Sequence, residues 1–188
     1  MKPRELIEFL NIMEKLKCNT RHSWTSGGRL ESVAEHSWRL ALTAFLVADE
    51  FPGVDMAKVV KMCIIHDIGE AVTGDIPAFL KTEQDEERED LAVAGLLSLL
   101  PGDIAHEFAG LFAEMSALAT PEAKLFKALD NLEALVSHNE APLETWLPLE
   151  HSENLTYGTK NSAYSEYLAA LREEIRRDSL RKMGRAQP

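Results

Sequence analysis

Histidine and carboxylate side chains follow a strongly apolar segment near the middle of the chain. After Val-Val-Lys-Met-Cys-Ile-Ile at 59–65, the sequence continues with His66, Asp67 and, three residues later, Glu70. Burying ionisable groups is costly unless something neutralises them. On a helix these side chains lie on one side and can hold a divalent metal ion. The alternative is a helix end with a capped His66 and a surface Asp67, and the His-Asp pair alone favours that alternative.

Two residues elsewhere in the chain favour the metal. His36 lies in Ser-Val-Ala-Glu-His-Ser-Trp, 30 positions before His66, and Asp130 lies close to the apolar face of a predicted helix. A carboxylate on such a face needs a counter-charge. Two neutral imidazoles and two carboxylates give a neutral site around a divalent ion, and imidazole favours transition metals over calcium. We therefore expect His36, His66, Asp67 and Asp130 to bind a transition-metal ion.

With these four residues in order, the sequence resembles the HD-domain metal-dependent phosphohydrolases. The pattern of that family is a His, then a His-Asp pair, then a distant Asp. Within the family, the chain is similar to the HD-domain 5′-deoxynucleotidases, the group of the human HD-domain-containing protein 2. The matching segments are Glu31–His36, His66–Glu70, Thr73–Pro77 and Leu129–Asp130. The similarity extends from about Leu6 to at least His138, which is most of the chain.

The resemblance implies a single compact helical bundle, the HD domain, over residues 1–188. Its core would span about 6–140, with a peripheral C-terminal helix at about 161–182. It also implies hydrolysis of (deoxy)ribonucleoside 5′-monophosphates to nucleoside and phosphate by a water that the metal activates. The extra adjacent His ligands of two-metal relatives are missing from the sequence, so we expect one ion. Its ligands fit manganese, cobalt, iron, zinc or nickel.

Three further residues receive roles from the resemblance. Glu70 is expected to be the general acid or base for the attacking water or the leaving 5′-oxygen; the alternative is a carboxylate that orients His66 or a water. Asp75 matches a position that contacts substrate and assists the reaction, although an Asp after Gly is also common in turns. Arg21 matches a phosphate-binding Arg, whose planar fork grips phosphate; otherwise it is a solvated loop residue. Bacterial relatives have a Trp after this Arg and the chain has His22, so the sugar preference stays open.

Two other functions stay open. The same scaffold could hydrolyse another phosphoester, such as a diphosphate or a cyclic phosphodiester. The chain could instead be a non-catalytic metal- or nucleotide-binding module, because a metal can serve folding alone. The presence of Glu70 beside the site argues against this module, since a purely structural ion does not need a nearby acid or base.

Composition limits the partners. The 188 residues carry 20 Lys and Arg against 31 Asp and Glu, a formal net charge of −11. That charge argues against polymeric nucleic acid and anionic membranes, but a local cation still permits a small phosphorylated substrate. No apolar run approaches the ~20 residues of a membrane helix, and the N-terminus lacks a signal-peptide core. Cys18 and Cys63 are expected to be reduced core residues, because they are few and far apart in the sequence. Reduced cysteines are typical of the cytosol, so we expect a cytoplasmic protein.

Helical periodicity dominates and strand alternation is hard to find, which predicts one all-α domain. Helices are expected at 3–17, 33–51, 55–69, 83–100, 103–118, 121–138 and 161–182, with loops at 19–31, 70–82 and 142–148. Helix caps are expected at Ser32, which pairs with Glu35, and at Asp55 and Thr120. Glu35 is therefore expected to cap a helix rather than to bind metal. The last four residues are expected to fray.

The remaining polar and aromatic side chains receive structural interpretations. Those expected in the core are Trp38, Phe45 and Met62. His22 is expected to be a solvated loop residue, with substrate contact as the alternative. The histidines expected at the surface or the core edge are His106, His138 and His151. The residues that are too generic to assign are Lys81, Asn131 and Glu133. Helical domains of this size often pair through the apolar faces of peripheral helices, so a homodimer is also possible.

Overall fold

Helices make up most of the structure, a computed structural model that describes residues 1–184. The α-helices are α1 (Pro3–Met13), α2 (Val33–Leu46), α3 (Met56–Ile65), α4 (Glu70–Thr73), α5 (Glu83–Leu97), α6 (Gly102–Ala117), α7 (Pro121–Glu140), α8 (Glu150–Thr156), α9 (Thr159–Ser162) and α10 (Glu166–Lys182). The other elements described are the 3₁₀ helices η1 (Glu14–Lys17), η2 (Ala48–Glu50) and η3 (Leu143–Thr145) and the strands β1 (Thr20–Trp24) and β2 (Leu30–Ser32). The predicted all-α fold class is confirmed. The fraying predicted for residues 185–188 falls outside the described residues.

A short β-hairpin occupies the segment predicted as a loop, so that prediction is wrong for the strand residues 20–24 and 30–31. β1 pairs antiparallel with β2, with Thr20 opposite Ser32 and Trp24 opposite Leu30. Gly28 has φ +80° in the turn, a conformation that glycine adopts without a steric penalty. Strands of five and three residues are too short to give a clear period-two pattern, which explains why the sequence did not reveal them.

The caps expected from the sequence start the helices that carry the candidate site. Ser32 accepts a hydrogen bond from the Glu35 amide, and the Glu35 carboxylate accepts one from the Ser32 amide, which forms the predicted capping box of α2. Asp55 caps α3 by accepting from the Lys58 amide, and Thr120 caps α7. These three helix starts are confirmed, and Glu35 is a capping residue.

Several predicted helix ends are wrong. α2 ends at Leu46 rather than near residue 51, because the chain tightens into η2. A turn of helix, α4, lies inside the predicted loop at 70–82. The last helix begins at Glu166 instead of residue 161, where Ser165 supplies the N-cap, and the separate short helix α9 precedes it.

The hydrophobic core lies where α2, α3 and α7 pack on one another, with Leu40, Met62 and Leu129 fully buried. Met62 is thus in the core as predicted. The same prediction is wrong for Trp38 and Phe45, which are 66% and 71% exposed on the outer face of α2. An apolar residue on a helix does not by itself reveal whether a neighbouring element covers it.

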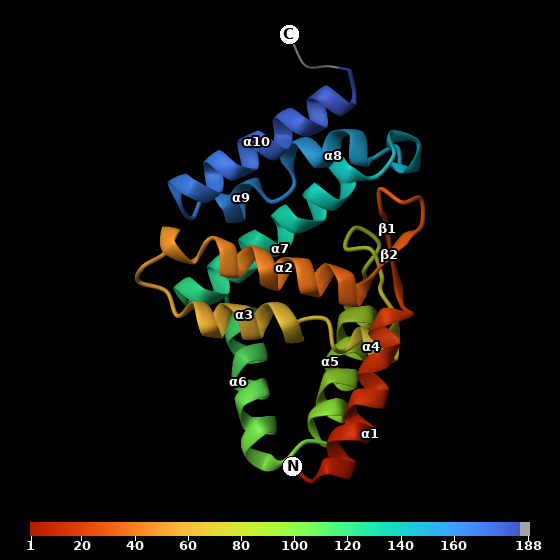
Figure 1. The fold of residues 1–188 in the computed structure, drawn as a ribbon, viewed down its shortest axis with the longest axis vertical. Coiled ribbons are helices and arrows are strands. Elements are labelled where there is room, and N and C mark those ends of the chain that lie inside the picture. The colour runs from red at the N-terminus through yellow and green to blue at the C-terminus, as the bar shows by residue number, and fades with distance from the viewer. Residues whose placement is uncertain (185–188) are drawn as a thin grey trace.

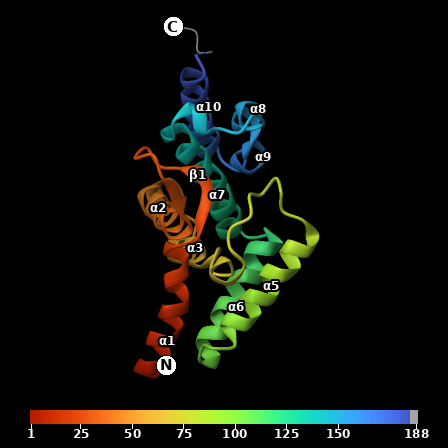
Figure 2. The same cartoon turned by 90° about the vertical axis from the view of Figure 1, so that its right-hand side faces the viewer.

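The elements form two groups on either side of this core (Figure 1). α8, α9 and α10 lie at one end of the long axis, and α1, α5 and α6 extend toward the other end, as the turned view in Figure 2 also shows. α10 contributes Leu168 and Ile175 to the same hydrophobic cluster. The division into a core at about 6–140 and a peripheral helix stays a prediction. Within residues 1–184 no helix combines the length and apolarity that crossing a bilayer requires.

Candidate metal centre

The four predicted metal-binding side chains meet between three elements. His36 comes from the first turn of α2, His66 and Asp67 from the turn after α3, and Asp130 from the middle of α7. His36 Nε2 lies 3.2 Å from His66 Nε2 and 3.3 Å from Asp130 Oδ1. His66 Nε2 lies 3.0 Å from Asp67 Oδ2. His66 Nε2 lies 3.8 Å from Asp130 Oδ1, and His36 Nε2 lies 3.9 Å from Asp67 Oδ2. Each imidazole is therefore within 4 Å of both carboxylates and of the other imidazole.

The hydrogen-bond partners of the two imidazoles test whether these residues fit a metal ion. His66 Nδ1 lies 2.9 Å from the carbonyl oxygen of Cys63, which can only accept, so Nδ1 carries the proton. His36 Nδ1 contacts a carboxylate oxygen of Glu133, which fixes the same tautomer. Both Nε2 atoms therefore direct lone pairs toward each other and toward two carboxylates. Ligand atoms at about 2.1 Å from an ion lie about 3.0–3.4 Å apart, so the arrangement fits a bound cation.

The charge distribution also favours a cation. Burial and the Arg21 guanidinium lower the pKa of His36, but hydrogen bonds to Asp130 and Glu133 outweigh them and raise it to about 10. Burial disfavours the charged form of Asp130, yet Lys127 and the two imidazoles hold its pKa well below the usual carboxyl range. The carboxylates therefore favour a positive charge at His36, which a proton supplies when no ion is bound and which a metal ion would supply in its place.

Glu133 is a member of this centre that the sequence did not reveal. It is 3% exposed, and its second oxygen accepts a hydrogen bond of 2.7 Å from Arg39 Nε. Burial alone would raise its pKa, but His36 and the neighbouring arginines lower it. The signal available in the sequence was its position three residues after Asp130, which puts both carboxylates on the same side of α7.

A cavity of about 350 Å³ opens beside the centre, within the range of roughly 300–1,000 Å³ that small-molecule sites occupy. Arg21 lines it from β1 rather than from the predicted loop. Burial disfavours its charge, but the carboxylates around it, Glu133 and Asp67 foremost, outweigh burial and raise its pKa. Its Nε atom is buried without a hydrogen bond and lies 3.7 Å from Glu31 Oε2, with which it forms an ion pair. Lys81 and Lys127 add two further cations to the cavity lining.

Glu70 and Asp75 also line the cavity. Glu70 begins α4, is 6% exposed, and its Oε2 atom has no hydrogen-bond partner. Burial, with Asp67 next in effect, raises the pKa of Glu70 well above the usual carboxyl range. Burial likewise raises the pKa of Asp75, although Arg21 opposes it. The structure thus brings all seven predicted site residues to one cavity or to the centre at its side.

Three side chains at another part of the cavity wall were misjudged or unassigned from the sequence. His22 is half-buried on β1 instead of solvated in a loop. His138, expected at the surface or core edge, is 9% exposed, and Glu150 is 3% exposed. They form a cluster whose residues are up to 128 positions apart in the chain, so no local pattern could join them.

Comparisons with known proteins agree with this geometry. A family model described as HD domain matches residues 13–172. The 5′-deoxynucleotidase HDDC2 of Homo sapiens is 33% identical over 141 residues, which are 73% of this chain and 68% of that protein. The 5′-deoxynucleotidase HDDC2 of Dictyostelium discoideum is 30% identical over 144 residues, 71% of this chain and 76% of that protein.

Solved structures extend the similarity over nearly the whole chain. A predicted metal-dependent phosphohydrolase from Magnetospirillum magnetotacticum MS-1 is 33% identical with a TM-score of 0.81, covering 98% of this chain and 95% of its own. A conserved hypothetical protein from Pyrococcus furiosus is 32% identical with a TM-score of 0.72, covering 91% and 99%.

Proposed function

The chain belongs to the HD-domain phosphohydrolase family, and we propose that it is a metal-dependent 5′-nucleotidase that hydrolyses (deoxy)ribonucleoside 5′-monophosphates to nucleoside and phosphate. The observation that carries the proposal is the pairing of four convergent lone-pair donors with a buried arginine at one small-molecule cavity. The relatives named 5′-deoxynucleotidases support the same substrate class.

His36, His66, Asp67 and Asp130 would hold one divalent transition-metal ion. When bound, such an ion supplies a Lewis acid that acidifies water and offsets charge on phosphoryl oxygens. Two neutral imidazoles and two carboxylates balance the charge of the ion, which keeps it electrophilic. The ligand types suit manganese, cobalt, iron, zinc or nickel, and geometry and availability select among them.

Arg21 would bind the phosphate. Its side chain lines the cavity, and its buried guanidinium stays charged among the surrounding carboxylates. A planar guanidinium can donate two parallel hydrogen bonds to a phosphate group. Lys127, which lies 2.9 Å from Asp130 Oδ2, would add positive charge at the same side. These cations explain how a chain with a net charge of −11 admits an anionic substrate.

Glu70 would donate a proton to the leaving 5′-oxygen of the substrate. A carboxyl group whose pKa is raised by burial keeps its proton near neutral pH, so it can donate that proton to the leaving 5′-oxygen. Asp75, on the same cavity wall, would contact the substrate and assist this transfer. We favour this role for Glu70 over one that only orients His66, because its Oε2 atom has no partner inside the protein.

Hydrolysis of another phosphoester by the same residues remains the second candidate, since the centre recognises phosphoryl oxygens and not the alcohol. A non-catalytic module is a weaker candidate, because a structural ion needs neither Glu70 nor Arg21 at the cavity. The expected cytoplasmic location stays a prediction.

Phosphate release from a panel of ribo- and deoxyribonucleoside 5′-monophosphates tests the proposal. The protein is stripped of metal and reloaded separately with manganese or cobalt, alongside Asp67→Asn, Glu70→Gln and the matched surface variant His106→Ala. We expect metal-dependent release in the wild type and in His106→Ala. Glu70→Gln should bind metal normally but turn over about 10²–10⁴-fold more slowly, because only the proton donor is lost.

The outcomes separate the candidates. Release that disappears in Asp67→Asn supports a metal-dependent nucleotidase, and the ratio between sugars measures its preference. Metal-loaded protein that releases phosphate only from other phosphoesters overturns the substrate assignment. Protein that binds metal but hydrolyses none of the phosphoesters tested is the module instead.

A further inference from the structure

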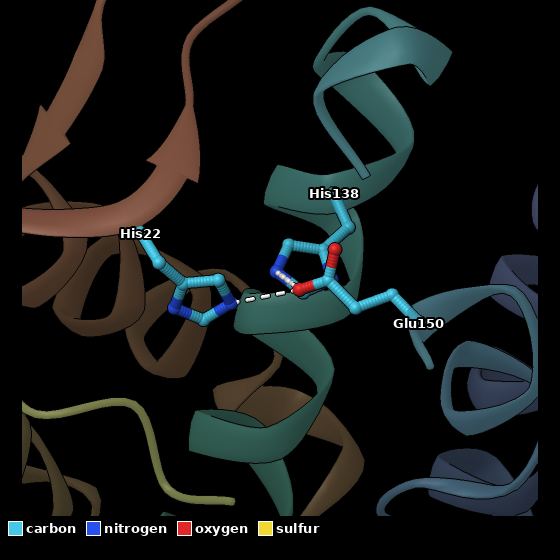
Figure 3. Close-up of side chains that lie close together, drawn as sticks. All are labelled: His22, His138 and Glu150. Atoms are coloured by element: carbon cyan, nitrogen blue, oxygen red, sulfur yellow. Dashed lines mark hydrogen bonds and ion pairs between the residues drawn. The ribbon is translucent and has the colours of Figure 1, made fainter. Parts of the chain in front are cut away.

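A second cluster of metal-ligand side chains faces the same cavity, away from the centre described above. It consists of His22 from β1, His138 from α7 and Glu150 at the start of α8 (Figure 3). All three residues line the cavity. His138 follows Asp130 on α7 by eight residues, or about 12 Å along the helix axis. The two clusters are therefore separate, since paired ions in hydrolases lie about 3.5–4 Å apart.

The three side chains point toward one another (Figure 3). Glu150 Oε1 lies 2.8 Å from His22 Nε2 and 3.5 Å from His138 Nε2. One ligand atom from each residue lies within 4.8 Å of the other two. The second carboxylate oxygen of Glu150 accepts a hydrogen bond of 2.7 Å from the Leu147 amide, which fixes the orientation of the carboxylate. The cluster is therefore held in place before any ligand enters.

His138 supplies an independent observation that points to a ligand at this cluster. Its residue is 9% exposed, and its Nε2 atom is buried without a hydrogen-bond partner. Its Nδ1 atom lies 3.0 Å from Asn154 Oδ1, whose amide Nδ2 is also buried without a partner; in this arrangement Nδ1 carries the proton and Nε2 directs a lone pair at the Glu150 carboxylate. Two lone pairs that face each other in a buried place repel unless a cation lies between them.

We propose that His22, His138 and Glu150 form a second metal site that binds a divalent ion of the zinc class, Zn²⁺, Co²⁺ or Ni²⁺. Two imidazoles and one carboxylate are ligands that such ions use, and three protein ligands leave a fourth position open. That position faces the cavity, because all three residues line it.

The ion would connect three elements that are distant in the sequence. β1 also carries Arg21, directly before His22, so a metal at this cluster would anchor the strand that presents Arg21 to the cavity. An ion that binds only the folded protein stabilises it by mass action. The site is therefore expected to raise the melting temperature, and this effect does not depend on any nucleotidase activity.

Zinc titration of a chain that lacks the first centre tests the proposal. In His66→Ala/Asp67→Ala, we expect one equivalent of zinc to bind and to raise the melting temperature. Adding His22→Ala, a change at a half-buried strand residue, should weaken zinc binding by more than roughly 100-fold. Loss of a residue that only hydrogen-bonds to a metal ligand already lowers metal affinity by about 10–100-fold, and His22 would be a ligand itself. Adding Glu150→Gln tests a second ligand in a variant that keeps the shape of the side chain. His106→Ala on the exposed part of α6 is the matched control and should change nothing.

Cobalt absorption gives a readout of the ligands themselves. The His66→Ala/Asp67→Ala protein should show the visible bands of tetrahedral or five-coordinate cobalt, and His22→Ala should abolish them. Absence of zinc binding below millimolar concentration in this background would overturn the proposal and leave a hydrogen-bonded His-Glu network. Binding that survives both His22→Ala and Glu150→Gln would overturn it as well, since the ion would lie elsewhere.

Discussion

The carboxylate of Glu133 contacts both His36 and Arg39. One oxygen contacts His36 Nδ1 and the other accepts from Arg39 Nε at 2.7 Å. A carboxylate behind a ligating imidazole fixes its tautomer and increases its basicity, so it acts on the metal without touching it. Arg39 also pairs with Glu140, whose side chain is 52% exposed, and this provides a matched comparison.

Glu133→Gln should therefore lower metal affinity by about 10–100-fold, because the imidazole of His36 loses its anionic partner. Competition with a chelator of known affinity measures this change. Glu140→Gln removes another partner of Arg39 without reaching His36 and should leave metal affinity unaltered. Equal losses in both variants would assign the effect to Arg39 and contradict the role of Glu133.

At the scale of elements, α7 is the scaffold on which both clusters depend, and α9 packs against it through a close backbone contact. Gly158, just before α9, has φ +73°, and a Cβ atom there would lie 2.9 Å from Asn131 Cβ. Asn131 in turn donates to the Tyr157 hydroxyl at 2.9 Å and accepts from Asn161 at 2.7 Å. A residue that the sequence left unassigned thus holds α9 to the middle of α7.

Gly158→Ala should destabilise the protein by about 1–3 kcal/mol, because alanine is strained at positive φ and its methyl group would collide with Asn131. Urea unfolding measures the change. Gly95→Ala is the control: Gly95 lies inside α5, where a methyl group would meet no other atom within 4 Å, and alanine should stabilise that helix by about 0.5–1 kcal/mol. Similar stability in the two variants would contradict the close contact between α9 and α7.

At the scale of the whole molecule, the outer face of α2 carries an uncovered apolar surface. Its residues are Trp38 at 66%, Leu42 at 39%, Phe45 at 71% and Leu46 at 71% exposed. Residues 38, 42, 45 and 46 follow the spacing of one helix face. Contiguous apolar surface of this kind marks interaction sites in soluble proteins. The predicted homodimer stays a prediction, and this face is where we expect a second copy to pack.

Sedimentation velocity checks that expectation. The wild type should sediment as a dimer, and Trp38→Ser/Phe45→Ser should sediment as a monomer with unchanged helical content. Leu91→Ser, at a residue that is 73% exposed on α5, should leave the dimer intact. A wild type that is monomeric at every concentration tested would contradict the prediction, and so would a double variant that still pairs.

The sequence alone determined the features that depend on local spacing. Helix caps at Ser32, Asp55 and Thr120 act within three residues, so their chemistry is readable from neighbouring letters. The all-α class followed from helical periodicity, and the four expected metal-binding residues from their order and their resemblance to a known family. A buried charged residue in an apolar pattern indicates a partner even before that partner is known.

Only the tertiary structure decided which distant side chains meet. The contact of His36 with Glu133 spans 97 positions, and that of His22 with Glu150 spans 128. It also decided that Trp38 is exposed while Met62 is covered, although both lie on apolar helix faces. The physical reason is that burial and long-range contacts depend on how helices pack on one another, and a periodic pattern in one segment carries no information about the segment that will cover it.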